Sequence, residues 1–508
     1  MTSKPDRFSA QRREKLAKIR GRGINPYPNT YHRSHTAQEA VAVLKQSEEA
    51  RRAKEPAEIT VRGLVEDGAP SVSIGGRIMA RRGMGKISFL DLRDGSGKIQ
   101  LLFGDALNPG LVELSKDIDI GDIIGATGRV FRTRTGEPTV AVSEFSLLSK
   151  SLEPLPEKWH GLADVDLRYR QRYLDLISNP EVKETFEARC KAVAAVRHFM
   201  NQRGFMEVET PVLQPSAGGA LAKPFITHHN ALDQDFFLRI ALELHLKRLI
   251  VGGFDKVYEI GRIFRNEGID ASHSPEFTML ESYEAYADYN DVMKMVEEMV
   301  SEVCMKVHGT TEIKFGEHAI DLKTPWRRIT LRDAVKEYGG IDFVAHPTAD
   351  GLREKMRSMS IEADPKQNWA KLVDELLSTC VKPKIIQPTF LIDYPVSMSP
   401  LAKTKPGEER VVERFQAFVA GQLEIANAYT ELNDPLEQRE RFVKQLKERT
   451  AEGEERWTID EDFLTALEYG MPPTGGLGVG VDRLVMLLTN QSTIREVILF
   501  PTLKEKAL

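Results

Sequence analysis

Charged and aromatic side chains alternate along two neighbouring stretches near the middle of the sequence. Val257–Asn266 and Glu276–Tyr286 are expected to be strands joined by a polar loop. Alternation with a period of two gathers Ile263, Arg265 and Glu267 on one face of the first strand, and Phe277, Met279, Glu281 and Tyr283 on one face of the second. Unpaired charge is costly in an apolar core, so a groove for a charged ligand explains this face better. A hairpin whose polar face meets water is the alternative.

A third polar face is expected in the segment Leu423–Asp434. Its side chains Asn427, Tyr429 and Glu431 alternate onto one face of a strand, and Glu424 points to the other face. A strand with one solvated face would show the same pattern.

The segment Gly475–Met486 predicts a glycine-rich strand that runs into an amphipathic helix beginning near Asp482. Glycine lets a ligand approach the backbone closely, and Arg483 would lie at the helix N-terminus, where phosphate is favoured. Close packing of two elements would also require glycines here. The sequence has neither a G-x-G-x-x-G after a first strand nor a G-x-x-x-x-G-K-[ST] motif, so Rossmann and P-loop nucleotide binding are not indicated.

The elements before these segments predict a small barrel followed by a mixed domain. Strands are expected at Val72–Arg81, Lys86–Leu92, Lys98–Phe103, Ile123–Arg132 and Pro138–Leu147, with a short helix at Asn108–Lys116. This order matches an OB barrel, although another small Greek-key barrel would also fit. The segment Val193–Gln214 predicts a helix that leads into a strand ending at Pro211.

The composition is that of an ordinary soluble protein. The 508 residues are 41% hydrophobic and 29% charged, with a net charge of −5 and three cysteines far apart. No apolar run is long enough for a membrane span, no signal-peptide core is present, and the cysteines fit a reducing cytosol, so a cytoplasmic location is expected. A basic helix at Ser9–Arg20 would suit an RNA backbone or be a solvated face.

Together the segments resemble the three signature motifs of class II aminoacyl-tRNA synthetases. The first motif ends at Pro211, the second contains Phe264-Arg265-Asn266-Glu267, and the third is Gly478–Arg483. The preceding barrel and the stretches Arg168–Leu176, Ile226–Leu232 and Ile498–Pro501 are similar to the lysyl members of the aspartyl, asparaginyl and lysyl subgroup. The implied fold is α+β: a five-stranded OB barrel, then a catalytic domain built on an antiparallel sheet flanked by helices.

The resemblance also implies domain bounds. Residues 1–62 would be a helical extension, 63–150 the OB-fold anticodon-binding domain and 151–175 a linker. Residues 176–508 would be the catalytic domain, with a helical insertion at about 326–384. The first motif would form a homodimer interface.

The same resemblance assigns the site residues and partners, which are ATP, L-lysine, tRNA(Lys) and Mg²⁺. Arg265 and Arg483 would be the catalytic pair, on the α- and γ-phosphates. ATP would also meet Glu267, His273, Phe277 and Glu424. Lysine would be bound by Gly219, Glu243, Glu281, Tyr283, Asn427, Tyr429 and Glu431. The anticodon would be bound by Phe89, Gln100 and Glu137.

Charge supports lysine as the substrate. Each buried ammonium needs an acidic partner, and Glu243, Glu281 and Glu431 supply them, whereas an aspartyl pocket would need cations. Many family members have Phe where Tyr429 stands, so an aromatic wall is retained. The lysine carboxylate is already an anion, so positioning and charge stabilisation would suffice for its attack on ATP.

The expected metal site departs from the family pattern. Relatives usually carry two glutamates, one in Arg-Phe-Glu and one about seven residues later. Here the residues are Arg414-Phe415-Gln416, and Glu424 follows eight residues on. Because Mg²⁺ prefers carboxylate and phosphate, weaker metal binding by the protein is expected, with Glu424 as its acidic ligand.

Three rival interpretations stay open at this point. The chain could be an aspartyl- or asparaginyl-type synthetase, a lysyltransferase that modifies elongation factor P, or a non-catalytic RNA-binding paralogue. Such lysyltransferases lack the OB domain, and such paralogues typically lose motif residues that are present here.

Overall fold

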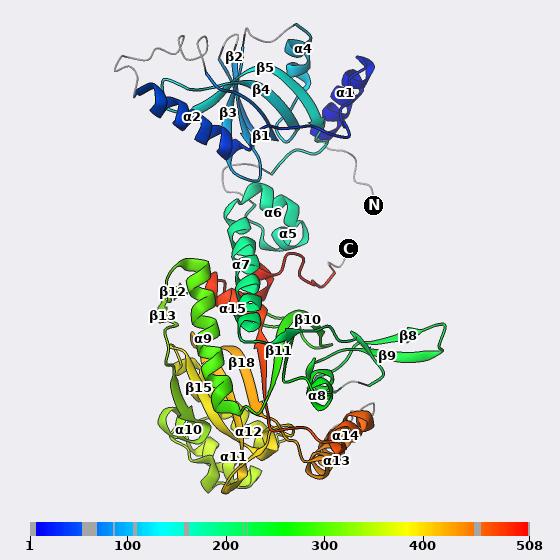
Figure 1. Ribbon diagram of the computed structural model, residues 1–508, viewed down its shortest axis with the longest axis vertical. Coiled ribbons are helices and arrows are strands. Elements are labelled where there is room, and N and C mark those ends of the chain that lie inside the picture. Colours follow the sequence, from blue (N-terminus) through cyan, green and yellow to red (C-terminus); the bar gives the residue numbers. More distant parts are fainter. Residues whose placement is uncertain are drawn as a thin grey trace. The chain divides into compact units, whose positions relative to one another are not determined.

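The computed structural model describes residues 7–52, 69–84, 87–104, 109–156, 162–216, 218–220, 222–451 and 459–505. The chain forms two compact units, Met1–Gly161 and Leu162–Leu508 (Figure 1). The expected boundary between residues 62 and 63, and residues 157–161 of the expected linker, lie outside the described residues.

The first unit is built around a closed five-stranded barrel. Its strands are β1 (Ser71–Met84), β2 (Ile87–Arg93), β3 (Lys98–Phe103), β4 (Ile123–Arg132) and β5 (Pro138–Ser149), in the order β1-β2-β3-β5-β4. Helix α4 (Pro109–Asp117) connects β3 to β4, as an OB fold requires. Alternate strand residues such as Leu90, Leu92 and Leu101 fill the barrel. The five-stranded barrel is therefore confirmed.

Two N-terminal helices belong to this unit, α1 (Arg7–Gly21) and α2 (Ala37–Arg52). Several basic groups of α1 are engaged within the unit. Arg12 donates to the carbonyls of Ser151 and Ile120, and Lys15 pairs with Asp119 at 2.5 Å. Some basic side chains of α1 therefore hold the helix against the rest of this unit.

The second unit is organised by a mostly antiparallel sheet of nine strands. The order is β14 (Arg327–Thr330), β15 (Thr389–Pro395), β17 (Glu408–Val419), β18 (Leu423–Thr430), β19 (Thr474–Gly480), β11 (Glu276–Ala285), β10 (Lys256–Phe264) and β6 (Met206–Glu207), and β16 (Thr404–Lys405) pairs with β17. Among the described strands of this sheet, only the β10–β6 and β14–β15 pairs are parallel. The expected antiparallel sheet is confirmed.

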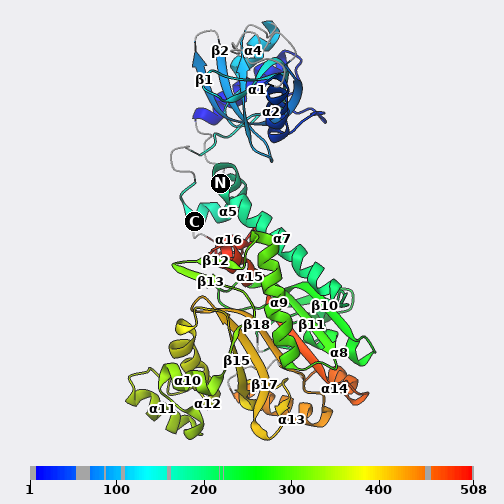
Figure 2. The same ribbon diagram turned by 60° about the vertical axis from the view of Figure 1, so that its left-hand side comes forward.

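One face of this sheet is covered by three helices, α7 (Glu181–Gln202), α9 (Tyr289–His308) and α15 (Val481–Leu488) (Figure 2). Leu280, Ala426 and Val479 point from the strands into the apolar core under these helices. The alternate residues of the same strands face the other way, toward α8 (Glu243–Val251), α13 (Pro435–Ala451) and α14 (Glu461–Glu468). The opposite face is therefore free to hold polar side chains.

Residues 326–384, expected as a helical insertion, contain α10 (Leu331–Gly339), α11 (Ala349–Ser358) and α12 (Trp369–Leu376). These helices share an apolar cluster of their own with β15 and β17. The stretch also contributes β14, which belongs to the central sheet. Smaller elements are the hairpin β12 (Glu312–Phe315) and β13 (His318–Asp321), the sheet of β7 (Leu213–Gln214), β9 (Gln234–Leu238) and β8 (Ile226–His229), and α16 (Ile494–Val497).

The end of the expected linker is helical and belongs to the second unit. It forms α5 (Val165–Arg170) and α6 (Arg172–Ser178). The fully buried Arg172 pairs with Asp175 at 2.5 Å and donates to the carbonyls of Leu499 and Arg495. These bonds attach α6 to the C-terminal segment. Residues 165–175 are therefore part of the second unit and not a linker.

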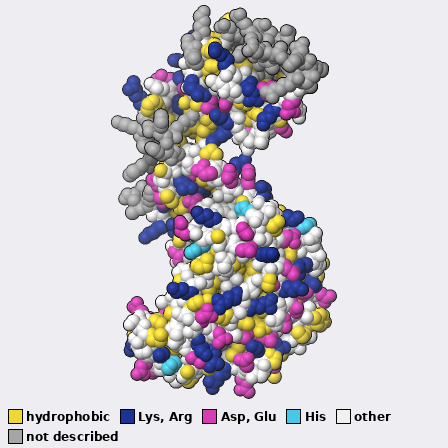
Figure 3. All heavy atoms as spheres, turned by 90° about the vertical axis from the view of Figure 1, so that its left-hand side faces the viewer, with side chains coloured by type: hydrophobic (Ala, Val, Ile, Leu, Met, Phe, Trp, Pro, Cys, Tyr) yellow, Lys and Arg dark blue, Asp and Glu magenta, His cyan; other side chains and the backbone are white. Residues whose placement is uncertain are grey.

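The described surface of the second unit mixes Lys and Arg with Asp and Glu on the face drawn in Figure 3. Among the residues that the structure describes, no helix has both the length and the apolar character needed to cross a lipid bilayer.

Candidate active site

Two adjoining cavities lie on the polar face of the sheet. The larger has a volume of about 320 Å³ and the smaller about 190 Å³. They share Arg265, Met279, Asn427 and Gly478 in their linings, so one ligand could reach into both.

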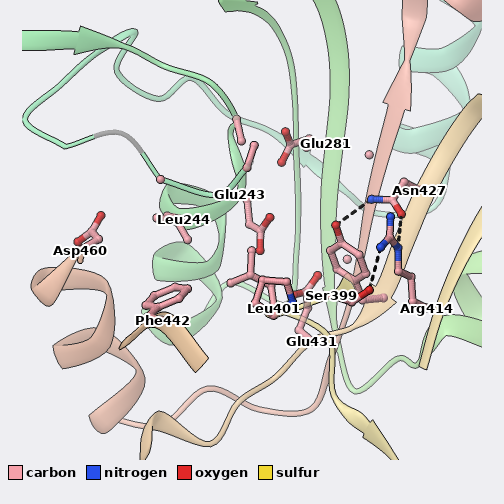
Figure 4. Close-up of a pocket in the computed structure, with 18 of the residues that line it drawn as sticks. Glu243, Leu244, Glu281, Ser399, Leu401, Arg414, Asn427, Glu431, Phe442 and Asp460 are labelled. Atoms are coloured by element: carbon pink, nitrogen blue, oxygen red, sulfur yellow. Dashed lines mark hydrogen bonds between the residues drawn. The ribbon is translucent and has the colours of Figure 1, made fainter. Parts of the chain in front are cut away.

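Three buried glutamates line the larger cavity (Figure 4). Glu243 comes from the first turn of α8, Glu281 from β11 and Glu431 from the residue after β18, and their carboxylates surround the same space. Their exposed fractions are 4%, 4% and 0%. A pocket with three carboxylates shielded from water is built for a cationic ligand, because uncompensated buried charge is otherwise costly.

The burial of these carboxylates changes their acidity. Burial raises the pKa of Glu281 to about 7, although the Leu242 N–H bonded to it at 3.0 Å opposes the shift. Burial also raises the pKa of Glu431 to about 8, against the opposing charge of Lys247. The pKa of Glu243 is raised for the same reason. A bound cation would reverse these shifts by favouring the ionised forms.

Polar and aromatic side chains form the wall beside Glu431. The Asn427 side-chain amide donates to the Tyr429 hydroxyl at 2.8 Å. Arg414 on β17 donates to the Asn427 carbonyl oxygen at 3.0 Å and to the Ser399 hydroxyl at 2.8 Å. Tyr283 donates to Glu281 at 3.3 Å. The hydrogen bonds drawn in Figure 4 hold Asn427 and Tyr429 in one orientation.

Two positions in the cavity lining require glycine. A side chain at Gly476 on β19 would overlap the Glu431 carboxylate and the Tyr283 ring. Gly219 has a φ of +84°, a region that favours glycine, and it lines the cavity beside Glu243.

The smaller cavity is lined by the residues assigned to ATP: Arg265, Glu267, His273, Phe277, Glu424 and Arg483. The Arg265 guanidinium lies 5.1 Å from the centre of the Phe277 ring. Arg483, in the first turn of α15, donates to the Glu424 backbone carbonyl at 3.3 Å. Two arginines and an aromatic ring in the lining of one cavity suit a nucleoside triphosphate.

Two expectations about strand faces are wrong. Glu424 was expected on the face opposite Asn427, but both line the smaller cavity. The reason is a β-bulge, since Ala417 pairs with Ala426 and Phe418 pairs with Glu424, which leaves Ile425 unpaired.

Arg265 and Glu267 were expected to alternate with Ile263 on one strand. However, β10 ends at Phe264, and Ile263 is buried in an apolar cluster. Arg265 and Glu267 therefore reach the cavity from the loop after the strand. For Phe277, Met279, Glu281 and Tyr283 the expected common face is correct, since all four line the cavities.

The position of Gln416 follows from strand pairing. It lies opposite Asn427 in the β17–β18 register, on the same face of the sheet, but it is not among the residues that line either cavity. Within the described ranges, no cluster of three or more His, Cys, Asp or Glu side chains could hold a metal ion.

Two residues at the site were not predicted from the sequence as site residues. Lys247 is fully buried and forms ion pairs with both Glu243 and Glu431. Its four-residue spacing from Glu243 on a helix was an available signal. Arg414 was noted only as part of the metal motif, and its alternation with Gln416 could have placed it on the same face.

The three residues expected to meet the anticodon lie in the barrel unit. Phe89 on β2 and Gln100 on β3 alternate with core residues and therefore belong to the outer face of the barrel. Gln100 is only 7% exposed and accepts a hydrogen bond from Thr139 at 3.0 Å. Glu137, just before β5, lies 3.7 Å from the Lys98 ammonium.

Comparisons with known proteins agree with this geometry. Residues 164–504 match the family model "tRNA synthetases class II (D, K and N)", and residues 72–148 match "OB-fold nucleic acid binding domain". The chain is 60% identical over 501 residues to a lysine–tRNA ligase of Dehalococcoides mccartyi, covering 98% of both chains. It is 52% identical to the lysine–tRNA ligase of Pelotomaculum thermopropionicum, with 97% and 94% coverage, and 49% identical to that of Bacillus subtilis, with 97% of each covered. The chain therefore belongs to the lysine–tRNA ligase family of class II tRNA synthetases.

Proposed function

We propose that this chain activates L-lysine with ATP to form lysyl-adenylate and pyrophosphate, and then transfers the lysyl group from the adenylate to the 3′-terminal ribose of tRNA(Lys), releasing AMP. The observation that carries the proposal is the group of three buried glutamates, Glu243, Glu281 and Glu431, in a cavity that adjoins Arg265. Lysine is the one standard amino acid with two primary ammonium groups, and each buried ammonium needs an acidic partner.

The proposed pose places lysine in the larger cavity and ATP in the smaller one. Glu243, Glu281 and the carbonyl of Gly219 would surround the α-ammonium, and Glu431 would bind the ε-ammonium. The aliphatic chain would lie against Tyr283, Asn427 and Tyr429. The lysine carboxylate would then point to Arg265, which lines both cavities.

The proposed chemistry is positioning and charge stabilisation. The lysine carboxylate attacks the α-phosphorus, and Arg265 stabilises the charge that develops there. Arg483 would hold the γ-phosphate, Phe277 would stack on adenine, and Glu267 and His273 would hold the nucleotide from the loop. Alignment of the two reactants can supply roughly 7–11 kcal/mol, so a separate acid–base pair is not required.

Magnesium fits the smaller cavity through one protein carboxylate. Glu424 lines that cavity about 4.0 Å from Arg483, and Mg²⁺ is commonly bound by one or two carboxylates together with substrate phosphates. The ion would neutralise phosphate charge. We propose that Glu424 is its protein ligand and that Gln416 leaves more of the binding to ATP.

Recognition of tRNA is proposed for the barrel unit. Phe89 would stack on an anticodon base, and Gln100 and Glu137 would read base edges. Such stacking contributes about 1–3 kcal/mol per base. The buried Gln100 would have to exchange its bond with Thr139 for a bond to the base.

A homodimer through the first motif is also proposed. Apolar side chains around this motif are exposed in the single chain, with Met206 at 52% and Leu213 at 45%. A second copy would cover them. The activity would serve protein synthesis in the cytoplasm.

Exchange of labelled pyrophosphate into ATP tests the proposed reaction and the rival substrate classes together. Lysine should support exchange, while aspartate and asparagine should not, because their side chains bring no cation to the three glutamates. Exchange that depends on aspartate or asparagine in place of lysine would refute the proposal.

A further inference from the structure

An ammonium group of the protein lies behind the glutamates that line the larger cavity. Lys247 follows Glu243 by one helical turn on α8, and its side chain is 0% exposed. Its Nζ atom is 2.5 Å from Glu243 Oε1 and is also ion-paired with Glu431. Glu243 and Glu431 line the cavity, whereas Lys247 does not. Lys247 therefore contacts from the protein side two carboxylates that a ligand would contact from the cavity side.

The surroundings of Lys247 keep it charged. Its ammonium lies 5.9 Å from the centre of the Tyr283 ring and 5.8 Å from that of Phe463. Burial alone would lower its pKa, but the attraction of Glu243 and Glu431 outweighs burial and raises the pKa above its usual value. The titratable groups that face this cluster are Glu243 on α8, Glu281 and Tyr283 on β11, and Tyr429 and Glu431 at the end of β18.

The charges of this cluster match those of lysine. Three carboxylates and one protein ammonium leave two negative charges, and free lysine brings two ammonium groups. Arg265 lines the same cavity, and because within the described part of the chain only its Nε atom is bonded to a backbone carbonyl, that of Ile240 at 3.3 Å, its terminal nitrogens would meet the lysine carboxylate. Arg414, the other arginine in the lining, is held by Asn427, Ser399 and the carbonyl of Met398. Without Lys247 the pocket would carry one buried negative charge that lysine could not neutralise.

We propose that Lys247 is a positioning residue that determines amino-acid specificity, because its ammonium joins Glu243 to Glu431 and fixes their spacing and charge. This inference rests on the proposed function, in which those two glutamates bind the α- and ε-ammonium groups. A fixed spacing selects the length of the substrate chain. Ornithine, one methylene shorter, would then fail to reach both carboxylates at once.

The test is the variant Lys247→Met, which removes the charge and keeps an unbranched side chain. Glu243 and Glu431 would lose their shared cation, and one of them would take up a proton and stop accepting an ammonium. We expect the KM for lysine to rise roughly 100-fold, in line with the cost of breaking a buried ion pair. The KM for ATP should stay unchanged, and the ratio of kcat/KM for lysine over ornithine in pyrophosphate exchange should fall.

The pH profile separates positioning from a purely structural role. Loss of Lys247 should move the acid limb of kcat/KM for lysine to higher pH, because the glutamates ionise less readily without it. Lys247→Arg should return part of the activity. Lys256→Met is the matched control, since Lys256 pairs with Glu284 at 2.6 Å at a partly exposed site on β10. A variant with lower thermal stability but unchanged KM for lysine and pH profile would overturn the proposal.

Failure of the variant to fold is also informative. Uncompensated carboxylates with raised pKa values destabilise the folded chain as the pH rises, so Lys247→Met should be folded at about pH 6 and lose stability toward about pH 8. A variant unfolded at both pH values would contradict the proposal.

The exchange assay separates this inference from the proposed function. If the wild type fails to exchange pyrophosphate with lysine, the proposed function fails instead. If the wild type exchanges and Lys247→Met matches it, only this inference fails.

Discussion

The carboxylate of Asp482 accepts a hydrogen bond from the backbone N–H of Thr278 at 2.6 Å. It also pairs with Arg189 of α7 at 2.5 Å. Asp482 precedes Arg483, and Thr278 follows Phe277. This contact therefore fixes the arginine proposed for the γ-phosphate relative to the ring proposed for adenine.

Replacing Asp482 with Ala should weaken ATP binding more than lysine binding. The Thr278 N–H would lose its acceptor and the Arg189 guanidinium its carboxylate partner, although Arg189 would keep its bonds to the Val497 carbonyl and the Thr278 hydroxyl, at a cost of about 2–4 kcal/mol in the free energy of unfolding. We expect a lower melting temperature and a higher KM for ATP, with the KM for lysine little changed. Equal increases in both KM values would show that the contact does not act on the nucleotide site alone.

The pocket glutamates predict a pH dependence of lysine use. Because the pKa values of Glu281 and Glu431 are raised to about 7 and about 8, the ammonium-binding forms become populated as the pH rises. The value of kcat/KM for lysine should therefore increase between about pH 6 and 8.5. A profile that is flat over this range would contradict the raised pKa values.

The same pKa values predict how stability depends on pH. Without lysine, the folded chain holds protons on Glu281 and Glu431 that the unfolded chain has released, so their contribution to the free energy of unfolding falls as the pH rises from about 4.5 to about 8. Lysine should restore this contribution by binding the ionised forms. Thermal melts with and without lysine should thus differ more at about pH 8 than at about pH 6.

Gly476→Ala should impair lysine use. The added methyl group would overlap the Glu431 carboxylate and the Tyr283 ring, so one of them would have to move. We expect a large rise in the KM for lysine, measured by pyrophosphate exchange. Gly75→Ala in the barrel is the control, because its methyl group would lie 3.6 Å from the Tyr31 ring, an ordinary contact. A Gly476→Ala enzyme with a normal KM would show that the pocket can relax there.

Arg172 predicts a stability effect far from the substrate cavities. Its buried guanidinium pairs with Asp175 and donates to three carbonyls of the C-terminal segment, those of Leu499, Arg495 and Ile498. Arg172→Met should lower the free energy of unfolding by about 3–5 kcal/mol, because Asp175 would lose a buried partner. Calorimetry would measure the loss, and Arg439→Met, at an exposed pair with Glu461, should change little. Similar melting temperatures for the two variants would refute this assignment.

The alternation of polar and apolar residues predicted much of the fold, because most strands of the protein are regular. β3 and β4 have the predicted bounds, and the alternation of Phe277, Met279, Glu281 and Tyr283 was correct because β11 has regular partners on both sides. An alternation with a period of two predicts which residues share a face whenever one face of the strand is buried.

The error about Glu424 and the omission of Lys247 have a common physical origin in tertiary packing. The bulge that turns Glu424 toward Asn427 depends on how β18 pairs with β17. The residues of β18 alone do not predict this pairing. Lys247 has the type and spacing of a surface ion pair on a helix. It is buried because α8 packs against β11 and α14, and only this packing brings it to Glu431.

Aminoacylation of tRNA(Lys) with lysine, compared between the wild type and Glu431→Gln, tests the central claim most directly. Glu284→Gln is the matched control, because Glu284 lies on β11 outside the cavity and pairs with Lys256. We predict that the wild type and the control charge the tRNA, while Glu431→Gln loses at least about 100-fold in kcat/KM for lysine, since the ε-ammonium would be buried without its carboxylate. Equal charging by Glu431→Gln and the wild type would contradict the account.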